Sequence, residues 1–295
     1  MCGIVAATSQ SNVISILTEG LKHLEYRGYD SAGIAFIDNK TISIFKKEGN
    51  VSKLTESLDS EVISNIGIAH TRWATHGKPS ERNAHPHISE NNIAIVHNGI
   101  IENHIEIKNK FFKNKTLSSN TDSEVLAHLI NYFSGKNEIL DAVHLAIQEV
   151  KGTYAVAVLD KNNPKKIIGA RNGSPLVVGL GDKENYIASD VQALLKHTSK
   201  FVYLEDGDIA TITADEVKIF DKNKKNVRRE TKKSTLTLNS SSKGDFEHYM
   251  LKEIFEQPGA IKSTLQDRII NDAVPKEILG PNAEKYLKKF KVVQI

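Results

Sequence analysis

The sequence has little of what several common classes of protein require. It contains one cysteine in 295 residues, which excludes an internal disulfide framework and a zinc site built from several cysteines. No run of 18 or more apolar residues occurs, and the first residues, MCGIVAATSQ, lack the basic start and long apolar stretch of a signal peptide. We therefore expect a soluble, cytoplasmic protein with no membrane partner.

Positively and negatively charged residues are nearly equal in number. Lys and Arg number 39 against 36 Asp and Glu, which gives a formal net charge of +3, and 39% of the residues are hydrophobic. This balance implies neither disorder nor a nucleic-acid partner. The RNGSP stretch at 171–175 lacks a following Lys-Ser or Lys-Thr helix start, so no glycine-rich phosphate loop is present.

The order of the apolar patterns predicts strands, then paired helices, then many strands. Apolar residues recur at helical spacing within 12–25, and β-rich runs at 32–37 and 41–46 flank a hairpin signal. Further strands are predicted at 66–73 and 92–97, helices at 125–133 and 139–150, and a series of strands between 153 and 220. This segregation favours an α+β fold with antiparallel sheets covered by helices, and it disfavours a regular βαβ array.

The periodicity is lost after residue 221, where the chain becomes rich in Lys, Arg, Asn, Ser and Thr. We predict a first domain at 1–222, a linker at 223–244 and a last segment at 245–295. The last segment is too short to build a core of its own, so we expect the start of a second domain there. Helices are predicted at 245–255 and 284–290, and the start of a strand at 291–295.

The one cysteine is the second residue. A small second residue favours removal of Met1, which would make Cys2 the N-terminal residue and place an α-amine beside its thiol. Because such an amine has a reference pKa of about 7.7–8.0, it suits a general base that later acts as an acid. In N-terminal nucleophile enzymes, one residue supplies both the nucleophile and the base in this way. The simpler interpretation is a small buried side chain near a chain end, so the hypothesis needs companion residues.

Companion motifs occur in order along the chain. They are CGIVAA from residue 2, LEYRGYDSAG from 24, GIAHTRWATHG from 67, NAHPH from 83, VHNGIIEN from 96, NTDSEV from 120, KGTYA from 151, ARNGSPL from 170 and ASDVQALL from 188. With them the chain resembles the class II glutamine amidotransferases, and within them most closely the branch that makes glucosamine 6-phosphate from fructose 6-phosphate. The resemblance implies a four-layer αββα N-terminal nucleophile hydrolase fold. HYMLKEIFEQP, from residue 248, resembles the start of that branch's sugar isomerase (SIS-type) domain.

The resemblance implies a catalytic role for three residues. Cys2 attacks the carboxamide of glutamine, and its α-amine serves as the base. The Asn98 side chain and the Gly99 N–H stabilise the oxyanion. From the residues alone, Asn-Gly is also the strongest signal for a tight hairpin turn.

The resemblance assigns glutamine binding to four further residues. Arg72 binds the carboxylate, with Thr75 and His76 completing the clamp, and Asp122 holds the α-ammonium. The simpler interpretations are a surface ion pair for Arg72 and a helix N-cap for Asp122.

Two residues are given supporting roles by the same resemblance. Arg27 braces the loop around Cys2, and Trp73 lies in a segment, 73–79, that closes over glutamine and excludes water. An ordinary helix C-terminal cation and a plain core aromatic are the respective alternatives.

Six histidines between residues 70 and 104 invite the hypothesis of a metal site. No HExxH motif and no cysteine pair accompany them, and the resemblance implies no metal and no other cofactor in this domain. We expect His85 and His87 to stabilise loop structure by hydrogen bonds.

The resemblance implies an enzyme that hydrolyses L-glutamine to glutamate and ammonia through a Cys2 thioester. In the full-length enzyme, expected to be a homodimer, the ammonia would convert fructose 6-phosphate to glucosamine 6-phosphate. This chain ends where the sugar domain begins, so we expect glutaminase activity only. The alternatives are a non-catalytic glutamine-binding regulatory module and the amidotransferase domain of another class II enzyme: amidophosphoribosyltransferase, asparagine synthetase or glutamate synthase.

Overall fold

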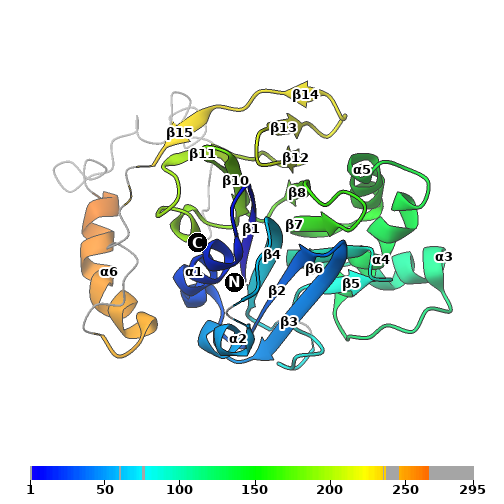
Figure 1. The fold of residues 1–295 in the computed structure, drawn as a ribbon. Coiled ribbons are helices and arrows are strands. Elements are labelled where there is room, and N and C mark those ends of the chain that lie inside the picture. Colours follow the sequence, from blue (N-terminus) through cyan, green and yellow to red (C-terminus); the bar gives the residue numbers. More distant parts are fainter. Residues whose placement is uncertain (1, 60, 75–76, 235, 237–245, 266–295) are drawn as a thin grey trace, which may run out of the picture. The chain divides into compact units, whose positions relative to one another are not determined.

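The computed structural model describes residues 2–59, 61–74, 77–234, 236 and 246–265. These residues belong to two compact units, Met1–Ser241 and Ser242–Ile295. The described part of the second unit contains one helix, α6 (Tyr249–Leu265). The described part of the first unit contains two antiparallel sheets and the helices that cover them (Figure 1).

The two sheets are built from different strands of the chain. The first sheet has the order β15 (Thr231–Lys233), β11 (Lys200–Tyr203), β9 (Val177–Leu180), β10 (Glu184–Ala188), β1 (Gly3–Ser9), β4 (Ile66–Arg72), β2 (Ser31–Asp38) and β3 (Thr41–Glu48). The second sheet has the order β14 (Asn226–Val227), β13 (Val217–Phe220), β12 (Ile209–Ile212), β8 (Ile167–Asn172), β7 (Gly152–Asp160), β6 (Ile93–Ile101) and β5 (His87–Ser89). The N-terminal strand β1 is therefore central to the first sheet, because it lies between β10 and β4.

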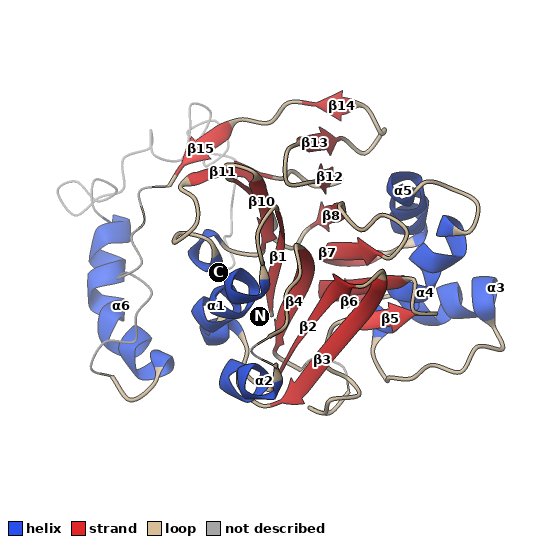
Figure 2. Ribbon diagram, viewed as in Figure 1, coloured by secondary structure: helices blue, strands red, loops and turns tan. Residues whose placement is uncertain are grey.

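Helices cover the outer face of each sheet. Against the first sheet lie α1 (Ile14–His23) and α2 (Val51–Ser57), together with the short 3-10 turns η1 (Glu25–Arg27) and η2 (Val191–Ala193). Against the second sheet lie α3 (His104–Phe112), α4 (Asp122–Ser134) and α5 (Ile139–Glu149), as Figure 2 shows.

The core has one apolar layer between the sheets and one on each outer face. Successive side chains of a strand point to opposite faces, so in β1 Ile4 packs between the sheets while Val5 packs under α1. The predicted α+β fold and its four-layer αββα arrangement are confirmed.

Most of the predicted elements are present. The hairpin of β2 and β3 is confirmed, as are α1, α4 and α5. The sequence prediction omitted β1, β5, β10, α2 and α3. The last two are short, at seven and nine residues, and each buries only one or two side chains, so their periodicity is weak.

The end of the first unit extends past the predicted start of the linker. Both β14 and β15 fall within 223–244 and pair with β13 and β11. The predicted helix at 245–255 corresponds to α6, while the elements predicted at 284–290 and 291–295 lie outside the described residues. The domain boundaries at 222 and 244 stay predictions. Within the described residues, no helix has the length and apolar character needed to span a membrane.

Candidate active site

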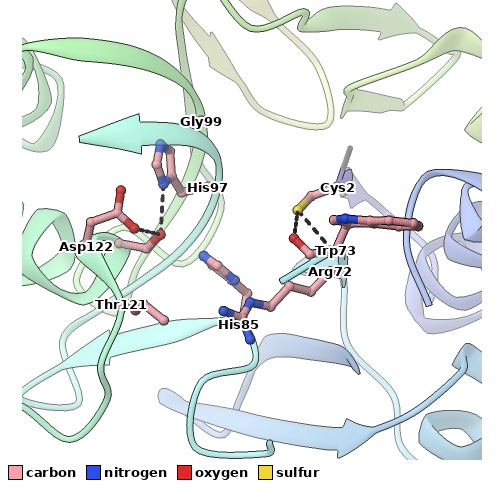
Figure 3. Close-up of a pocket in the computed structure, with 9 residues that line it drawn as sticks. Cys2, Arg72, Trp73, His85, His97, Gly99, Thr121 and Asp122 are labelled. Atoms are coloured by element: carbon pink, nitrogen blue, oxygen red, sulfur yellow. Dashed lines mark hydrogen bonds between the residues drawn. The ribbon is translucent and has the colours of Figure 1, made fainter. Parts of the chain in front are cut away.

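A small recess opens at the ends of the central strands (Figure 3). Figure 3 shows Cys2 and Trp73 on one side and Asp122 and His97 on the other, with Arg72 and His85 between them. The lining residues are Cys2, Arg72, Trp73, His85, His97, Gly99, Thr121, Asp122 and Ser123. The recess therefore contains the predicted nucleophile, both predicted binding charges and the predicted lid aromatic.

Strand pairing brings Cys2 and Arg72 together. Gly3 in β1 lies opposite Thr71 in β4, so the residues at the ends of these two strands are neighbours. Gly28 allows the turn before β2 to approach the same point, because a Cβ at Gly28 would lie 2.6 Å from the carbonyl carbon of Arg72. The site is thus set by backbone packing around the start of β1.

The Cys2 thiol is hydrogen-bonded to the backbone of Trp73. Sγ lies 3.5 Å from the Trp73 carbonyl oxygen and accepts a hydrogen bond from the Trp73 N–H at 3.3 Å. Burial raises the pKa of the Cys2 thiol, and the Trp73 N–H and the nearby Arg72 charge offset this only in part. The group is accordingly a thiol near neutral pH, and it needs a base before it can act as a nucleophile.

The Cys2 carbonyl oxygen is held from two sides. It accepts hydrogen bonds from Arg27 Nε at 3.1 Å and from Asn98 Nδ2 at 3.0 Å. The Arg27 guanidinium is in turn 3.2 Å from Asp190, which also accepts the Tyr26 hydroxyl at 2.9 Å. Arg27 is buried and anchored, and its contact with Cys2 fits the bracing role that the sequence predicted.

Asn98 and Gly99 do not form a turn. Both lie within β6 and pair with Ala155 and Tyr154 of β7, so the hairpin-turn interpretation is wrong. Gly99 has φ +136°, and a Cβ there would come within 2.0 Å of the Thr153 carbonyl oxygen. Only glycine fits at this position beside the recess.

Arg72 and Asp122 are both buried, with 3% and 6% of their surface exposed. Arg72 Nη2 donates to the Gly77 carbonyl at 3.3 Å, so the surface ion-pair interpretation is wrong. Asp122 is the first residue of α4 and not its N-cap, which is Thr121. The N-cap interpretation is therefore wrong as well. Instead, Asp122 Oδ2 accepts a hydrogen bond from the Ile101 N–H at 2.7 Å.

Trp73 is 47% exposed and touches Tyr29 edge-on, with 5.9 Å between the ring centroids. The core-aromatic interpretation is therefore wrong, and the indole lies at the mouth of the recess. The predicted contacts at Thr75 and His76 lie outside the described residues.

The histidines behind the recess are buried, and burial lowers the pKa of each of His70, His85, His87 and His97. His87 Nε2 is 2.9 Å from Thr121 Oγ1, as expected of a structural histidine. The same expectation is wrong for His85, because neither of its ring nitrogens has a hydrogen-bond partner among the described residues. In that part of the chain no group of three or more potential ligands could hold a metal ion.

Three lining residues had no role in the sequence analysis: His97, Thr121 and Ser123. His97 Nδ1 lies 2.8 Å from Ser123 Oγ, which connects β6 to the start of α4. All three belong to the motifs VHNGIIEN and NTDSEV. Membership of those motifs was the available signal, but it could not say which side chains face the recess.

Comparison with known proteins places this geometry in context. Residues 70–196 match the family model described as a glutamine amidotransferase domain. Glutamine–fructose-6-phosphate aminotransferase (isomerizing) of Shewanella oneidensis is 47% identical, and that of Escherichia coli K12 is 48% identical. Both alignments cover 100% of this chain and 49% of the relative, so the chain spans about half the length of these relatives.

A solved structure shares the fold. Glutamine phosphoribosylpyrophosphate amidotransferase from B. subtilis aligns with 75% of this chain and 49% of its own, with a TM-score of 0.65 and 25% sequence identity. The predicted N-terminal nucleophile hydrolase fold is confirmed by this likeness.

Proposed function

The chain contains a class II glutamine amidotransferase domain, and on that premise we propose that Cys2 hydrolyses L-glutamine to glutamate and ammonia. The observation that carries the proposal is the pairing of a partly buried cysteine with a buried cation and a buried anion in one recess. Glutamine carries a carboxylate and an ammonium beside its carboxamide, so Arg72 and Asp122 match its two charges.

The reaction begins with a proton transfer. Once Met1 is removed, the α-amine of Cys2 takes the thiol proton, and Sγ forms a bond to the carboxamide carbon of glutamine. The raised pKa of the thiol makes this base necessary. The carbonyl oxygen becomes an oxyanion, for which the Asn98 Nδ2 and Gly99 N–H groups are the donors in the proposal.

Ammonia leaves in the second step. The α-ammonium returns its proton to the departing nitrogen, the carbon–nitrogen bond breaks, and a γ-glutamyl thioester remains on Cys2. A water molecule, deprotonated by the α-amine, then attacks the thioester carbon, the carbon–sulfur bond breaks, and glutamate and the free thiol are released. Trp73, at the mouth of the recess, limits access of other water to the thioester.

The fate of the ammonia is proposed from the relatives. Because they are named as aminotransferases of fructose 6-phosphate, we propose that in the full-length protein the ammonia converts this sugar phosphate to glucosamine 6-phosphate. The chain spans about half of the relatives' length, so we expect it to hydrolyse glutamine without making the amino sugar. A homodimeric full-length protein and a cytoplasmic location stay predictions.

A direct test measures glutamate released from glutamine by the purified chain, with a parallel assay for glucosamine 6-phosphate when fructose 6-phosphate is added. Mass spectrometry of the same sample establishes whether Met1 is absent. We expect hydrolysis by the processed chain, none by Cys2→Ala and no amino sugar. Unchanged hydrolysis in Cys2→Ala would refute the mechanism, and glutamine binding without hydrolysis by the processed wild type would favour a regulatory module.

A further inference from the structure

A fully buried histidine lies beneath the predicted oxyanion hole. His70 has none of its surface exposed, and its Nε2 is 3.0 Å from Asn98 Oδ1 and 3.2 Å from the carbonyl oxygen of His97. It belongs to β4, whereas Asn98 belongs to β6, so the contact joins the two sheets. The ring packs on His85, with 4.1 Å between the centroids.

The orientation of the Asn98 amide follows from its other neighbour. The Cys2 carbonyl oxygen is a backbone acceptor that cannot donate, and the atom 3.0 Å from it must therefore be the amide nitrogen of Asn98. The oxygen of the same amide then faces His70. A flipped amide would put two acceptors against each other at Cys2.

The proton on His70 is fixed by the same reasoning. Two acceptors, Asn98 Oδ1 and the His97 carbonyl oxygen, face Nε2, so this nitrogen carries the hydrogen. A hydrogen on Nδ1 would be buried without an acceptor, because Nδ1 has no partner among the described residues. Burial lowers the pKa of His70 to about 3, which keeps the ring neutral and limits it to one N–H near neutral pH.

We propose that His70 is a positioning residue for the oxyanion hole: its Nε2–H holds the Asn98 amide so that the NH₂ group faces the nucleophile. One N–H of that group bonds the Cys2 carbonyl, and the second N–H is the donor for the oxyanion. This inference rests on the proposed glutamine hydrolysis. It adds a residue that touches neither the substrate nor the reacting atoms.

The size of the effect has an upper limit. Removing a side-chain donor from an oxyanion hole costs about 10²–10³ in kcat. His70 acts through that donor, so its loss costs no more than the loss of Asn98. We expect His70→Leu to lower kcat by about 10–100-fold, with little change in KM because the α-carboxylate and α-ammonium contacts are untouched.

Three variants separate positioning from general damage. In His70→Gln the terminal amide can still donate to Asn98 Oδ1, and we expect kcat within about tenfold of the wild type. In His70→Asn the amide is too short, and kcat stays low. His128→Leu is the matched control, since His128 is also a buried histidine but bonds Ser89 Oγ at 2.7 Å, and its kcat should match the wild type.

A double-mutant cycle shows whether His70 acts through Asn98. On an Asn98→Ala background, His70→Leu should lower kcat by less than about twofold, because coupled residues are not additive. Alkylation of the Cys2 thiol by iodoacetamide needs no oxyanion hole and should proceed at the wild-type rate in His70→Leu. Fully multiplicative effects on kcat, or equal loss of alkylation, would overturn the proposal.

A measurement on the wild type remains decisive even where a variant does not fold. Nitrogen-15 NMR of the His70 ring distinguishes the two tautomers, and we expect a hydrogen on Nε2 from pH 6 to 8. A hydrogen on Nδ1 would overturn the assignment. Loss of hydrolysis in the wild type itself, or hydrolysis by Cys2→Ala, would instead refute the proposed function and leave the tautomer result standing.

Discussion

Asp122 Oδ2 accepts the backbone N–H of Ile101 at 2.7 Å, and this bond ties the start of α4 to the strand that carries Asn98 and Gly99. Together with the contact of His97 Nδ1 with Ser123 Oγ, this buried hydrogen bond holds the predicted ammonium-binding carboxylate in register with the predicted oxyanion donors. Asp122 Oδ1 has a weaker contact, 3.5 Å from Ser123 Oγ. We therefore expect each substitution at the site to have its own effect on glutamine binding, turnover or stability.

Arg72→Lys should weaken glutamine binding more than it weakens the chemical step. Lysine keeps the charge but cannot form the two parallel bonds of a guanidinium with a carboxylate. Loss of a charge-assisted bond costs about 1.5–3 kcal/mol, which corresponds to a dissociation constant raised by about 10–100-fold. Calorimetry with the Cys2→Ala variant measures binding without turnover. Arg228→Lys, at an exposed arginine, is the control, and equal affinity in both variants would contradict the role of Arg72.

Asp122→Asn should also weaken binding, by about 10-fold or more, because it removes the charge that we propose binds the α-ammonium. The variant should still fold, since an asparagine oxygen can accept the Ile101 N–H. The control is Asp141→Asn, at an exposed surface pair with Lys224. Titration with glutamine and with a deaminated analogue tests the assignment. If the variant discriminates between the two ligands as well as the wild type does, Asp122 does not bind the ammonium.

Gly99→Ala should damage both stability and activity. The new Cβ would lie 2.0 Å from the Thr153 carbonyl oxygen, and φ of +136° is strained for alanine, at a cost of at least about 1–3 kcal/mol. Gly135→Ala provides a matched control, because its nearest neighbour would be 3.6 Å away and its φ is −62°. We expect that control to be neutral or more stable by up to about 1 kcal/mol. Urea unfolding of both variants compares the two effects directly, and similar midpoints would refute the close packing at Gly99.

Stability should fall as the pH is lowered below about 6.5, the pKa of histidine in an unfolded chain. Burial lowers the pKa of His70, His85, His87 and His97 in the folded state, to about 3 for His70, so the unfolded chain binds protons that the folded chain does not. Each such histidine contributes up to about 1.4 kcal/mol of lost stability per pH unit between its pKa in the unfolded chain and its own lower pKa in the folded chain.

Urea midpoints between pH 7.5 and 5 test this dependence in a range where carboxylates titrate little. The slope should be smaller in His85→Leu, which removes one of the protonatable rings. A midpoint that does not change over this range would contradict the assignment of neutral, buried histidines.

Much of the fold was predictable because its signals are local. Runs of β-forming, mostly apolar residues marked β2, β3, β6 and β7, and helical spacing marked α1, α4 and α5. The omitted α2 and α3 are short and bury only one or two side chains each, so little periodicity distinguishes them from loops. The range predicted as a linker was polar enough to hide β14 and β15, which are edge strands with exposed or half-buried side chains.

The sequence by itself determined which residues are candidates for the proposed chemistry: one cysteine at position 2, and the motifs that contain Arg72, Asn98, Gly99 and Asp122. Only the tertiary structure decided how they meet. The bond from Asn98 to the Cys2 carbonyl joins residues 96 apart, and the contact of His70 with Asn98 joins residues 28 apart on different sheets. Such contacts depend on strand register and on the packing of one sheet against the other, which no local pattern records.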